Sequence, residues 1–439
     1  MSFGRYGSYR ESGVDWLGLV PDHWVAHRLG FHFDERREKV SDADYAPLSV
    51  TKQGIVPQLE TAAKTDDGDN RKKVLAGDFV INSRSDRKGS AGLSRLDGSV
   101  SLINTVLAPK SSIHGRFAHY LLRSVAFQEE FYRYGKGIVA DLWSTNYSEM
   151  RNIALAVPPL GEQVAVATFL DRETAKIDAL VEEQRRLIEV LKEKRQAVIS
   201  HAVTRGLDHS APMKDSGIEW LGEVPAHWEV VRLGRAIDYQ EGPGIMADDF
   251  RDEGVPLMRV SGVGGRWATL QGCNYLDPEK VAKRWDHFRL TRGEMIISAS
   301  ASMGTVSEVG PDVVGAVPYT GLIRLRPKDQ LTERDYIRSL VSSWLFFVQI
   351  DLLKTGATIQ HFGPVHLAQM FVTRPPLAEQ RAIAVHVEEQ EEQFAALIGA
   401  AESGIELLIE RRAALISAAV TGKIDVRDQS AASAELKLT

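Results

Sequence analysis

PPLGEQVAVATFL at 158–170 opens a helical stretch that ends KRQAVISHAVTRGLD at 194–208. The same pattern returns as PPLAEQRAIAVHV at 375–387 and ERRAALISAAVTGKID at 410–425. At a constant offset of 217 positions, about 21 of the 51 residues from 158 to 208 are identical in the second copy. A repeat of this length indicates a duplicated domain rather than a solenoid.

A second duplication precedes each helical stretch. SGVDWLGLVPDHWVAHRLG at 12–30 returns as SGIEWLGEVPAHWEVVRLG at 216–234, with about 12 identities in 19 positions. We name these stretches the tryptophan cassettes. Because Trp buries so much apolar area, we expect their Trp residues to be core anchors that pack a loop on a helix. The chain is therefore predicted to be two copies of one module of roughly 200 residues.

Between each Pro-Pro pair and the predicted stop lie about 43 residues without proline, which corresponds to roughly 65 Å of helix. Glu162 and Glu379 lie in the first turn, where a carboxylate suits the positive end of a helix. Thr204-Arg205-Gly206 and Thr421-Gly422 are the predicted stops.

A heptad register counted from Ile177 makes five of seven a and d positions apolar in each helix. The apolar positions are Ile177, Leu180, Leu187, Leu191 and Val198, and then Phe394, Leu397, Ala401, Leu408 and Leu415, with Gln184, Lys194, Gly404 and Arg411 completing the register. Since repeats related by an internal two-fold axis pack that way, we predict an antiparallel coiled coil. The alternative is two unrelated helices, each lying on its own globule.

The segments before the helical stretches have the texture of mixed α+β globules. In the first, strands are predicted at 46–50, 77–83, 99–108 and 152–158, with a helix at 115–133. In the second, strands are predicted at 255–260, 293–300, 317–327 and 370–376, with a helix near 333–353. The two globules match only at a few landmarks, which are Gly77-Asp78 with Gly293-Glu294, Pro109-Lys110 with Pro327-Lys328, and Lys136-Gly137 with Thr355-Gly356. Two alike scaffolds with unlike globules indicate one mechanical role and two recognition roles.

The predicted fold class is α+β, with two mixed α/β domains separated by two long antiparallel coiled-coil helices in a pseudo-two-fold, circular internal repeat. The predicted boundaries are a first globule at 1–157, a helix at 158–208, a second globule at 209–374 with a linker at 209–215, a second helix at 375–426 and a tail at 427–439.

Composition excludes several classes of protein. Apolar content of 44% and charged content of 26% are those of a soluble globular protein. A single cysteine, Cys273, excludes an intrachain disulfide and fits a reducing cytoplasm, and residues 1–15 hold no apolar core of a signal peptide. The apolar stretch 340–353 is too short and polar for a membrane span and is read as a buried helix. A net charge of −6 means that any DNA contact must come from local basic patches.

No catalytic motif is found. The sequence has no phosphate-binding G-x-x-x-x-G-K-[ST] loop, no dinucleotide-binding G-x-G-x-x-G, no G-x-S-x-G elbow and no Cys/His cluster with metal spacing. An Asn-Pro-Pro-Tyr-like box for amino methylation is also missing. We therefore predict that the chain is not an enzyme by itself and binds no metal or cofactor.

Basic and polar loops are the remaining candidates, because they hold donors for phosphates and base edges. Seven basic and two acidic residues fall in 71–95, around a predicted strand. The candidate DNA-binding residues are Lys72, Lys73, Asn82, Arg84, Arg87, Lys88 and Lys136 in the first globule and Arg259, Arg266, Lys283, Arg284, Ser298, Ser300, Ser302, Lys354 and Thr355 in the second. The alternative for each loop is a solvated turn. The pairs Lys194-Arg195 and Arg411-Arg412 are read as a solvated helix face.

The cassette SGxxWLGxVPxHW-xxxRLG, the PPLxEQ opening and the AxISxAVT ending, arranged as globule–helix–globule–helix, resemble the specificity (S) subunit of type I restriction–modification systems. The resemblance covers nearly the whole chain, from 12 to 426. The motifs are specific in combination, although each one alone is not.

The resemblance implies that each globule is a target recognition domain for one half of a split double-stranded DNA sequence. It implies that the helices set the spacer between half-sites and dock two modification (methylase) subunits, through which restriction subunits join. S-adenosylmethionine, ATP and Mg²⁺ would belong to those partners. The strand-plus-loop segment of the family falls on 77–88 and 293–304, and its loops are therefore expected to face DNA.

Three alternatives remain open. The chain could be a specificity-like DNA-binding or scaffold subunit of a related methylation or defence system without a restriction partner. A stand-alone repressor would usually carry a helix-turn-helix, and none is found. A purely structural adaptor that bridges two identical partners would need only the helices.

Overall fold

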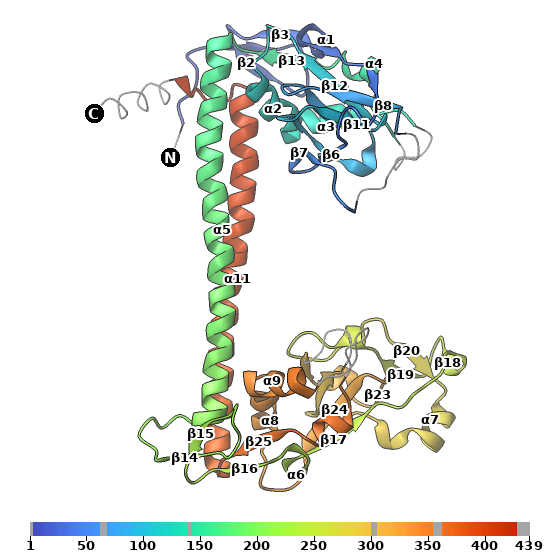
Figure 1. Cartoon of the computed structure of the whole chain (residues 1–439), viewed down its shortest axis with the longest axis vertical. Helices are drawn as coiled ribbons and strands as arrows, with labels where there is room; N and C mark the ends of the chain where they lie inside the picture. The colour runs from blue at the N-terminus through green and yellow to red at the C-terminus, as the bar shows by residue number, and fades with distance from the viewer. Residues whose placement is uncertain (1–2, 62–67, 138–142, 300–304, 354–361, 428–439) are drawn as a thin grey trace. The chain divides into compact units, whose positions relative to one another are not determined.

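The computed structural model describes residues 3–61, 68–137, 143–299, 305–353 and 362–427. The chain divides into two compact units, with unit 1 formed by Met1–Arg185 and Ser403–Thr439 and unit 2 by Arg186–Glu402. Each unit holds one globule and one part of each of two long helices (Figure 1). The offset of 217 positions that relates the repeats also relates Arg186 to Ser403, so the unit boundaries follow the repeat.

The long helices are α5 (Leu160–Arg205, 46 residues) and α11 (Leu377–Val420, 44 residues). Both start directly after a Pro-Pro pair. Gly206 follows α5 with φ 77°, and Gly422 follows α11 with φ 72°. Because glycine adopts this left-handed conformation without steric cost, it ends a helix sharply. The predicted starts and stops are confirmed.

In each unit, the tryptophan cassette joins the beginning of one helix to the end of the other. In unit 1, the buried Trp24 donates its indole N–H to Glu162 at the start of α5 (2.9 Å), and the end of α11 at Gly422 packs against the same indole. In unit 2, Trp228 donates to Glu379 at the start of α11 (2.8 Å), and Gly206 at the end of α5 packs against its ring. Opposite helix ends therefore meet at one point in each unit, which confirms the antiparallel pairing and the predicted Trp anchors.

The glutamine after each glutamate ties the helix start to its globule. The Gln163 side chain accepts from His114 N (2.7 Å) and donates to Pro158 O (2.9 Å). Gln380 does the same with Glu333 N (2.8 Å) and Pro375 O (2.8 Å). Both glutamines are almost fully buried, so these bonds satisfy backbone groups that water cannot reach.

Burial corrects the predicted heptad register. The a positions counted from Ile177 are right, because Ile177, Leu191, Ala401 and Leu415 are buried and Phe394, Leu408 and Val198 are half-buried. The d positions lie one residue later than predicted. Leu180, Leu187 and Leu397 are 51%, 44% and 53% exposed, whereas the neighbouring Val181 and Ile188 are buried and Ile398 is half-buried. Since both members of each pair are apolar, composition alone could not choose between them; packing against the antiparallel helix does.

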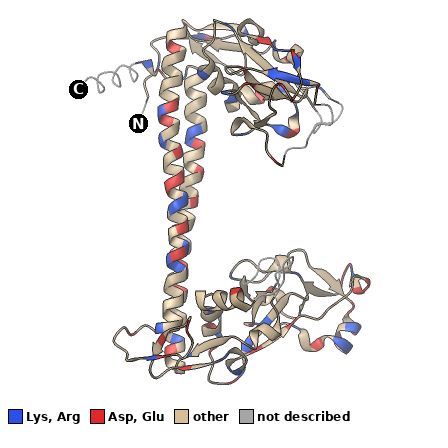
Figure 2. Ribbon diagram, viewed as in Figure 1, with Lys and Arg blue, Asp and Glu red and all other residues tan. Residues whose placement is uncertain are grey.

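The same register brings Arg195 and Arg412 to the helix seam instead of the solvated face on which they were expected. Both residues occupy corrected d positions, and the Arg412 Nε donates to Asp178 in unit 1 (2.8 Å). The outer faces of α5 and α11 carry interspersed charges of both signs (Figure 2).

Both globules contain the same four-stranded antiparallel sheet. In unit 1 its order is β10 (Ala91–Leu93), β9 (Phe79–Asn82), β12 (Asn104–Pro109) and β4 (Phe33–Glu35). In unit 2 the matching order is β22 (Val306–Glu308), β21 (Met295–Ser298), β24 (Leu322–Pro327) and β17 (Ile237–Glu241). The globules are therefore more alike than their sequences indicate, because many combinations of apolar residues fill one sheet.

The sequence landmarks have matched roles around this sheet. Gly77 (φ 98°) and Gly293 (φ 83°) turn the chain before β9 and β21. The carboxylates of Asp78 and Glu294 then accept from the backbone N–H three residues earlier, at 2.8 Å in each case. Lys110 and Lys328 both donate to the glycine carbonyl at the end of a cassette.

The globules differ beside this sheet, in the segments that precede β9 and β21 and in a short strand that precedes β12 in unit 1 and β24 in unit 2. Unit 1 adds a sheet of β11 (Gly98–Val100), β8 (Arg71–Val74) and β5 (Lys39–Val40), and a hairpin of β6 (Leu48–Thr51) and β7 (Gly54–Pro57). Unit 2 adds a sheet of β18 (Phe250–Arg251), β20 (Asn274–Leu276), β19 (Val255–Met258) and β23 (Val317–Pro318), and helix α7 (Pro278–Arg284).

Each single helix predicted in a globule is two helices. The expected helix at 115–133 consists of α2 (Gly115–Arg123) and α3 (Val125–Arg133), because Ser124 is extended (ψ 147°) and its hydroxyl accepts from Phe127 N. The expected helix near 333–353 consists of α8 (Arg334–Val341) and α9 (Trp344–Leu353). In the first globule, the serine at the break caps the next helix, a signal that hydrophobic periodicity does not contain.

The remaining elements complete the cassettes and close the globules. Strand pairs join β1 (Tyr9–Glu11) to β2 (Leu19–Pro21), β3 (Val25–Arg28) to β13 (Ala154–Val157), β14 (Met213–Asp215) to β15 (Glu223–Pro225), and β16 (Glu229–Arg232) to β25 (Phe371–Arg374). The short helices are α1 (Leu29–His32), α4 (Tyr147–Met150), α6 (Leu233–Ala236) and α10 (Pro364–Leu367).

A search of the described residues for membrane spans finds no single helix of sufficient length and apolar character. Only α8 and α9 taken together, with a bend of 59° between them, have such a composition. Leu345, Phe346 and Ile350 of α9 lie in the core of unit 2, as predicted for a buried helix.

The corrected register predicts unequal effects for two neighbouring residues of α5. Ile188→Ala removes a buried side chain and should lower the free energy of unfolding by about 2–4 kcal/mol. Leu187→Ala is the matched control and should cost less than about 1 kcal/mol, because this leucine is largely in solvent. Thermal and urea unfolding of both variants measures the difference, and equal losses would restore the register predicted from sequence.

Candidate nucleic-acid interface

The candidate loop of unit 1 follows β9 and contains a short 3-10 helix, η1 (Ser85–Arg87). Its base is well held. The Asn82 side chain is buried and its oxygen accepts from Arg84 N (3.1 Å), while Ser83 O accepts from Thr145 N (2.9 Å). Asn82 therefore orients the loop in this structure, and the loop presents its following residues from a rigid strand.

The β8 lysines are largely neutralised within the globule. Lys72 donates to Asn104 O (2.8 Å) and lies 3.5 Å from Glu35. Lys73 forms an ion pair with Glu38 (2.9 Å), and hydrogen bonding to Tyr45 and to Glu38 raises the pKa of Lys73. The count of basic residues in 71–95 therefore overstates the positive charge available to a ligand.

The arginines of the loop are less neutralised by carboxylates than the β8 lysines. Arg84 and Arg87 are exposed, and the nearest carboxylate to Arg87 is that of its neighbour Asp86, at 3.6 Å. Lys88 is held more firmly, by Glu129 at 2.6 Å and over the ring of Tyr132. Outside this loop, Lys136 pairs with Glu149 at 3.2 Å. Arg84 and Arg87 are therefore the cations of this loop best placed to meet a phosphate.

A polar hollow of about 630 Å³ adjoins the loop in unit 1. Asn82, Arg87 and Asn104 line it, together with Gln53 in the turn of the β6–β7 hairpin and Gln58 directly after β7. The Asn104 Oδ1 is buried without a partner in the structure. Amide groups and an arginine are the side chains that read base edges, so this hollow has suitable chemistry for a nucleotide.

The contribution of the hairpin to the hollow is not predicted from the sequence. Gln53 and Gln58 do not lie in a cluster of basic residues, which is the pattern that marks the candidate loops. The hairpin reaches the main sheet through two glycines: a Cβ on Gly92 of β10 would lie 3.0 Å from the Gly54 Cα. A pair of glycines on neighbouring strands is the only signal that the sequence holds for this approach.

In unit 2, Arg259 lies over the ring of Tyr319 (4.1 Å from the centroid) and near that of Phe250 (5.8 Å). Its Nη1 is buried and has no hydrogen-bond partner in the structure. A guanidinium stacked on an aromatic ring is held in place by the cation–π attraction, with its remaining N–H donors available to a ligand.

The other candidates of unit 2 are not gathered in one place. Arg266 forms an ion pair with Glu388 of α11, so it lies beside the helices. Lys283 and Arg284 are on α7, where Lys283 is 3.6 Å from Glu279 and Arg284 lies near the Trp285 ring. Ser298 is fully buried in β21. Ser300, Ser302, Lys354 and Thr355 lie outside the described residues.

The described residues contain no group of three or more His, Cys, Asp or Glu side chains that could hold a metal ion.

Comparison with known proteins finds similarity along nearly the whole chain. The chain is 26% identical over 319 residues to the type I restriction enzyme MjaVIII specificity subunit of Methanocaldococcus jannaschii, covering 70% of this chain and 71% of that protein. It is 22% identical over 441 residues to the putative MjaX specificity subunit of the same organism, covering 94% and 96%. The EcoKI specificity subunit of Escherichia coli is 25% identical over 215 residues, covering 46% and 44%. No family model matches the chain.

Solved structures share the fold. A chain from a structure of a type I restriction–modification system superposes with a TM-score of 0.67 at 18% identity, covering 91% of this chain and 98% of that one. The HsdS subunit from Thermoanaerobacter tengcongensis superposes with a TM-score of 0.51 at 18% identity, covering 92% and 98%. The predicted resemblance to specificity subunits and the predicted fold class are confirmed.

The turn that leads into β9 provides a stability test of the site. Asp78 is buried and forms a two-point ion pair with Arg36 (2.7 and 3.0 Å), which raises the pKa of Arg36. Asp78→Ala leaves that arginine unpaired and should lower the free energy of unfolding by about 3 kcal/mol. Asp86→Ala in the exposed loop should change it by less than about 0.5 kcal/mol. Urea unfolding of the two variants compares them, and a neutral Asp78→Ala would show that the ion pair does not hold the turn.

Proposed function

Because the chain resembles specificity subunits of type I restriction–modification systems along nearly its whole length, we propose that it is the DNA-recognition subunit of such a system. Each globule reads one half of a bipartite sequence in double-stranded DNA. The similarity to proteins named as specificity subunits, over 94% of this chain in one case, is the observation that carries the proposal.

Two features of unit 1 support a role in reading DNA. The exposed Arg84 and Arg87 offer cations to the phosphate backbone, and the polar hollow beside them offers amide groups to base edges. In unit 2, the donors of Arg259, stacked over Tyr319, offer a different chemistry. The two globules share the same sheet but present different side chains beside it. This difference is consistent with each globule reading a different half-site.

The helices serve as the common part of the proposed subunit. Their coiled coil sets the spacer between the half-sites, and their exposed apolar residues dock two methylase subunits, through which restriction subunits join. Leu180, Leu187 and Leu397, which the seam leaves in solvent, are suitable contacts for such partners. Methylation would rest on S-adenosylmethionine in the partners, and translocation on their ATP and Mg²⁺, so this chain contributes recognition and no chemistry.

Removing one loop arginine tests the recognition role. Arg84→Ala should weaken DNA binding by the assembled complex about fivefold or more, since it removes a phosphate contact, and the slope of log K against log salt should fall by about one. Filter binding or fluorescence anisotropy at several salt concentrations measures both quantities.

Lys73→Ala is the matched control, because Glu38 already neutralises this lysine. It should leave the affinity and the salt slope nearly unchanged. If Arg84→Ala behaves like this control, the loop faces away from DNA.

Shortening the helices tests the spacer role. Deleting residues 183–189 and 401–407 removes one heptad from each helix and keeps the a and d positions in phase. Each helix becomes about 10 Å shorter, which corresponds to about three base pairs of DNA. We expect the gap in the methylated sequence to change while both half-sites stay the same. Mapping of methylated adenines would detect this change. If the gap is unaltered, the helices do not set the spacer.

A further inference from the structure

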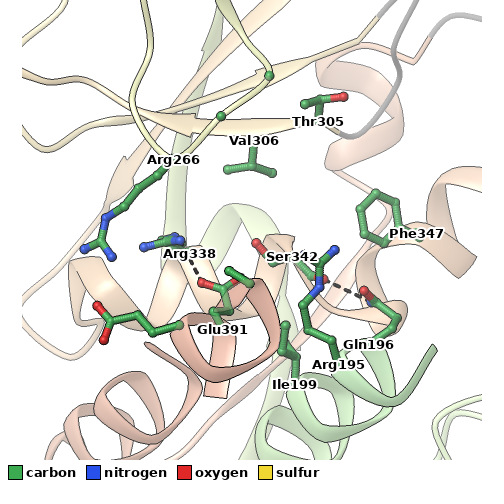
Figure 3. Close-up of a pocket in the computed structure, with 14 residues that line it drawn as sticks. Arg195, Gln196, Ile199, Arg266, Thr305, Val306, Arg338, Ser342, Phe347 and Glu391 are labelled. Carbon is green, nitrogen blue, oxygen red and sulfur yellow. Dashed lines mark hydrogen bonds and ion pairs between the residues drawn. The ribbon is translucent and has the colours of Figure 1, made fainter. Parts of the chain in front are cut away.

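A cavity of about 460 Å³ in unit 2 lies between α5, α11 and the globule (Figure 3). Arg195 of α5, Arg338 of α8 and Glu391 of α11 contribute charged groups to its lining, and Phe347 of α9 contributes an aromatic ring. The DNA-reading role proposed above makes no use of this cavity.

Two of the three arginines that line the cavity are paired with glutamates. Arg338 donates to Glu391 (2.7 Å), and Arg266 forms an ion pair with Glu388. Arg195 is different. Its Nε is buried and has no hydrogen-bond partner, and no carboxylate among the described residues forms an ion pair with it. Figure 3 shows its side chain rising from α5 into the cavity.

The internal repeat explains why Arg195 lacks a partner. The equivalent residue 217 positions later is Arg412, whose guanidinium makes two hydrogen bonds with Asp178 in unit 1, at 2.8 and 3.2 Å. The same offset assigns Ala395 to Asp178, and Ala395 lines the cavity together with Arg195. Unit 2 therefore keeps the arginine of this pair and replaces its carboxylate with a methyl group beside an open space.

We propose that this cavity binds a single carboxylate group, which takes the place that Asp178 has in unit 1. A guanidinium recognises a carboxylate through two parallel N–H donors. Arg195 is the lining arginine without a carboxylate partner among the described residues and can accept one carboxylate, whereas Glu391 and Glu392 in the lining disfavour a doubly charged phosphate. Phe347 and Ile199 give the cavity apolar surface for a short carbon chain.

The test uses the purified full chain, without DNA, and propionate as the probe. Thermal unfolding and calorimetric titration are compared in sodium propionate and in sodium chloride of equal ionic strength. We expect propionate to raise the Tm through binding to the native state. Arg195→Gln should weaken propionate binding about tenfold or more.

Ala395→Asp is the decisive variant, because it rebuilds the pair found in unit 1. It should raise the Tm in chloride and abolish the response to propionate. Arg412→Gln, the matched control in unit 1, should leave that response intact. A propionate response that survives in Ala395→Asp or Arg195→Gln would overturn the proposal, as would a larger response of the native chain to inorganic phosphate.

The source of the carboxylate is decided by repeating the titration on the chain assembled with its natural partners. A response that disappears on assembly identifies an acidic side chain of a partner protein as the occupant. A response that persists identifies a free carboxylate. Both results presuppose that the isolated chain binds propionate in the cavity. If the isolated chain does not respond to propionate at all, the proposed site is refuted.

Discussion

The hydrogen bond from a buried tryptophan to the glutamate in the first turn of a long helix is the contact on which the fold depends. It occurs as Trp24 with Glu162 and as Trp228 with Glu379. A carboxylate in the first turn is favoured by the helix dipole, and the indole N–H donates to it. The Glu162 side chain is 7% exposed, whereas that of Glu379 is 41% exposed. Because the same indole also packs against the glycine that ends the other helix, each cassette fixes two helix ends at once.

This constraint makes the repeat circular. Unit 1 is built from the beginning of the chain, the first part of α5 and the last part of α11, whereas unit 2 is continuous from Arg186 to Glu402. Each unit is completed by a helix end that comes from the other repeat. Neither half of the sequence therefore forms a unit by itself, and the two halves depend on each other for their cores.

The two repeats differ mainly in the segments beside the shared four-stranded sheet. Both globules keep a four-stranded sheet in the same order, and the added sheets and helices beside it are different. A sheet with one strongly determined register can support unlike peripheral segments, which is the usual way that one scaffold serves several ligands. The seam of the helices differs as well, since Asp178 in one copy corresponds to Ala395 in the other.

The sequence by itself determined the duplication, the two long helices with their ends, the Trp anchors and some of the strands, among them β9 and β21, because these depend on local signals such as Pro-Pro, Gly and apolar spacing. It could not determine which of Leu187 and Ile188 faces the partner helix, since both are apolar and the antiparallel neighbour decides. Nor could it show that Glu35 and Glu38 neutralise Lys72 and Lys73, or that Gln53 and Asn82 line the same hollow. Such pairs are distant in the sequence and are brought together only by sheet packing, so tertiary structure alone decided which of the predicted charges remain available to a ligand.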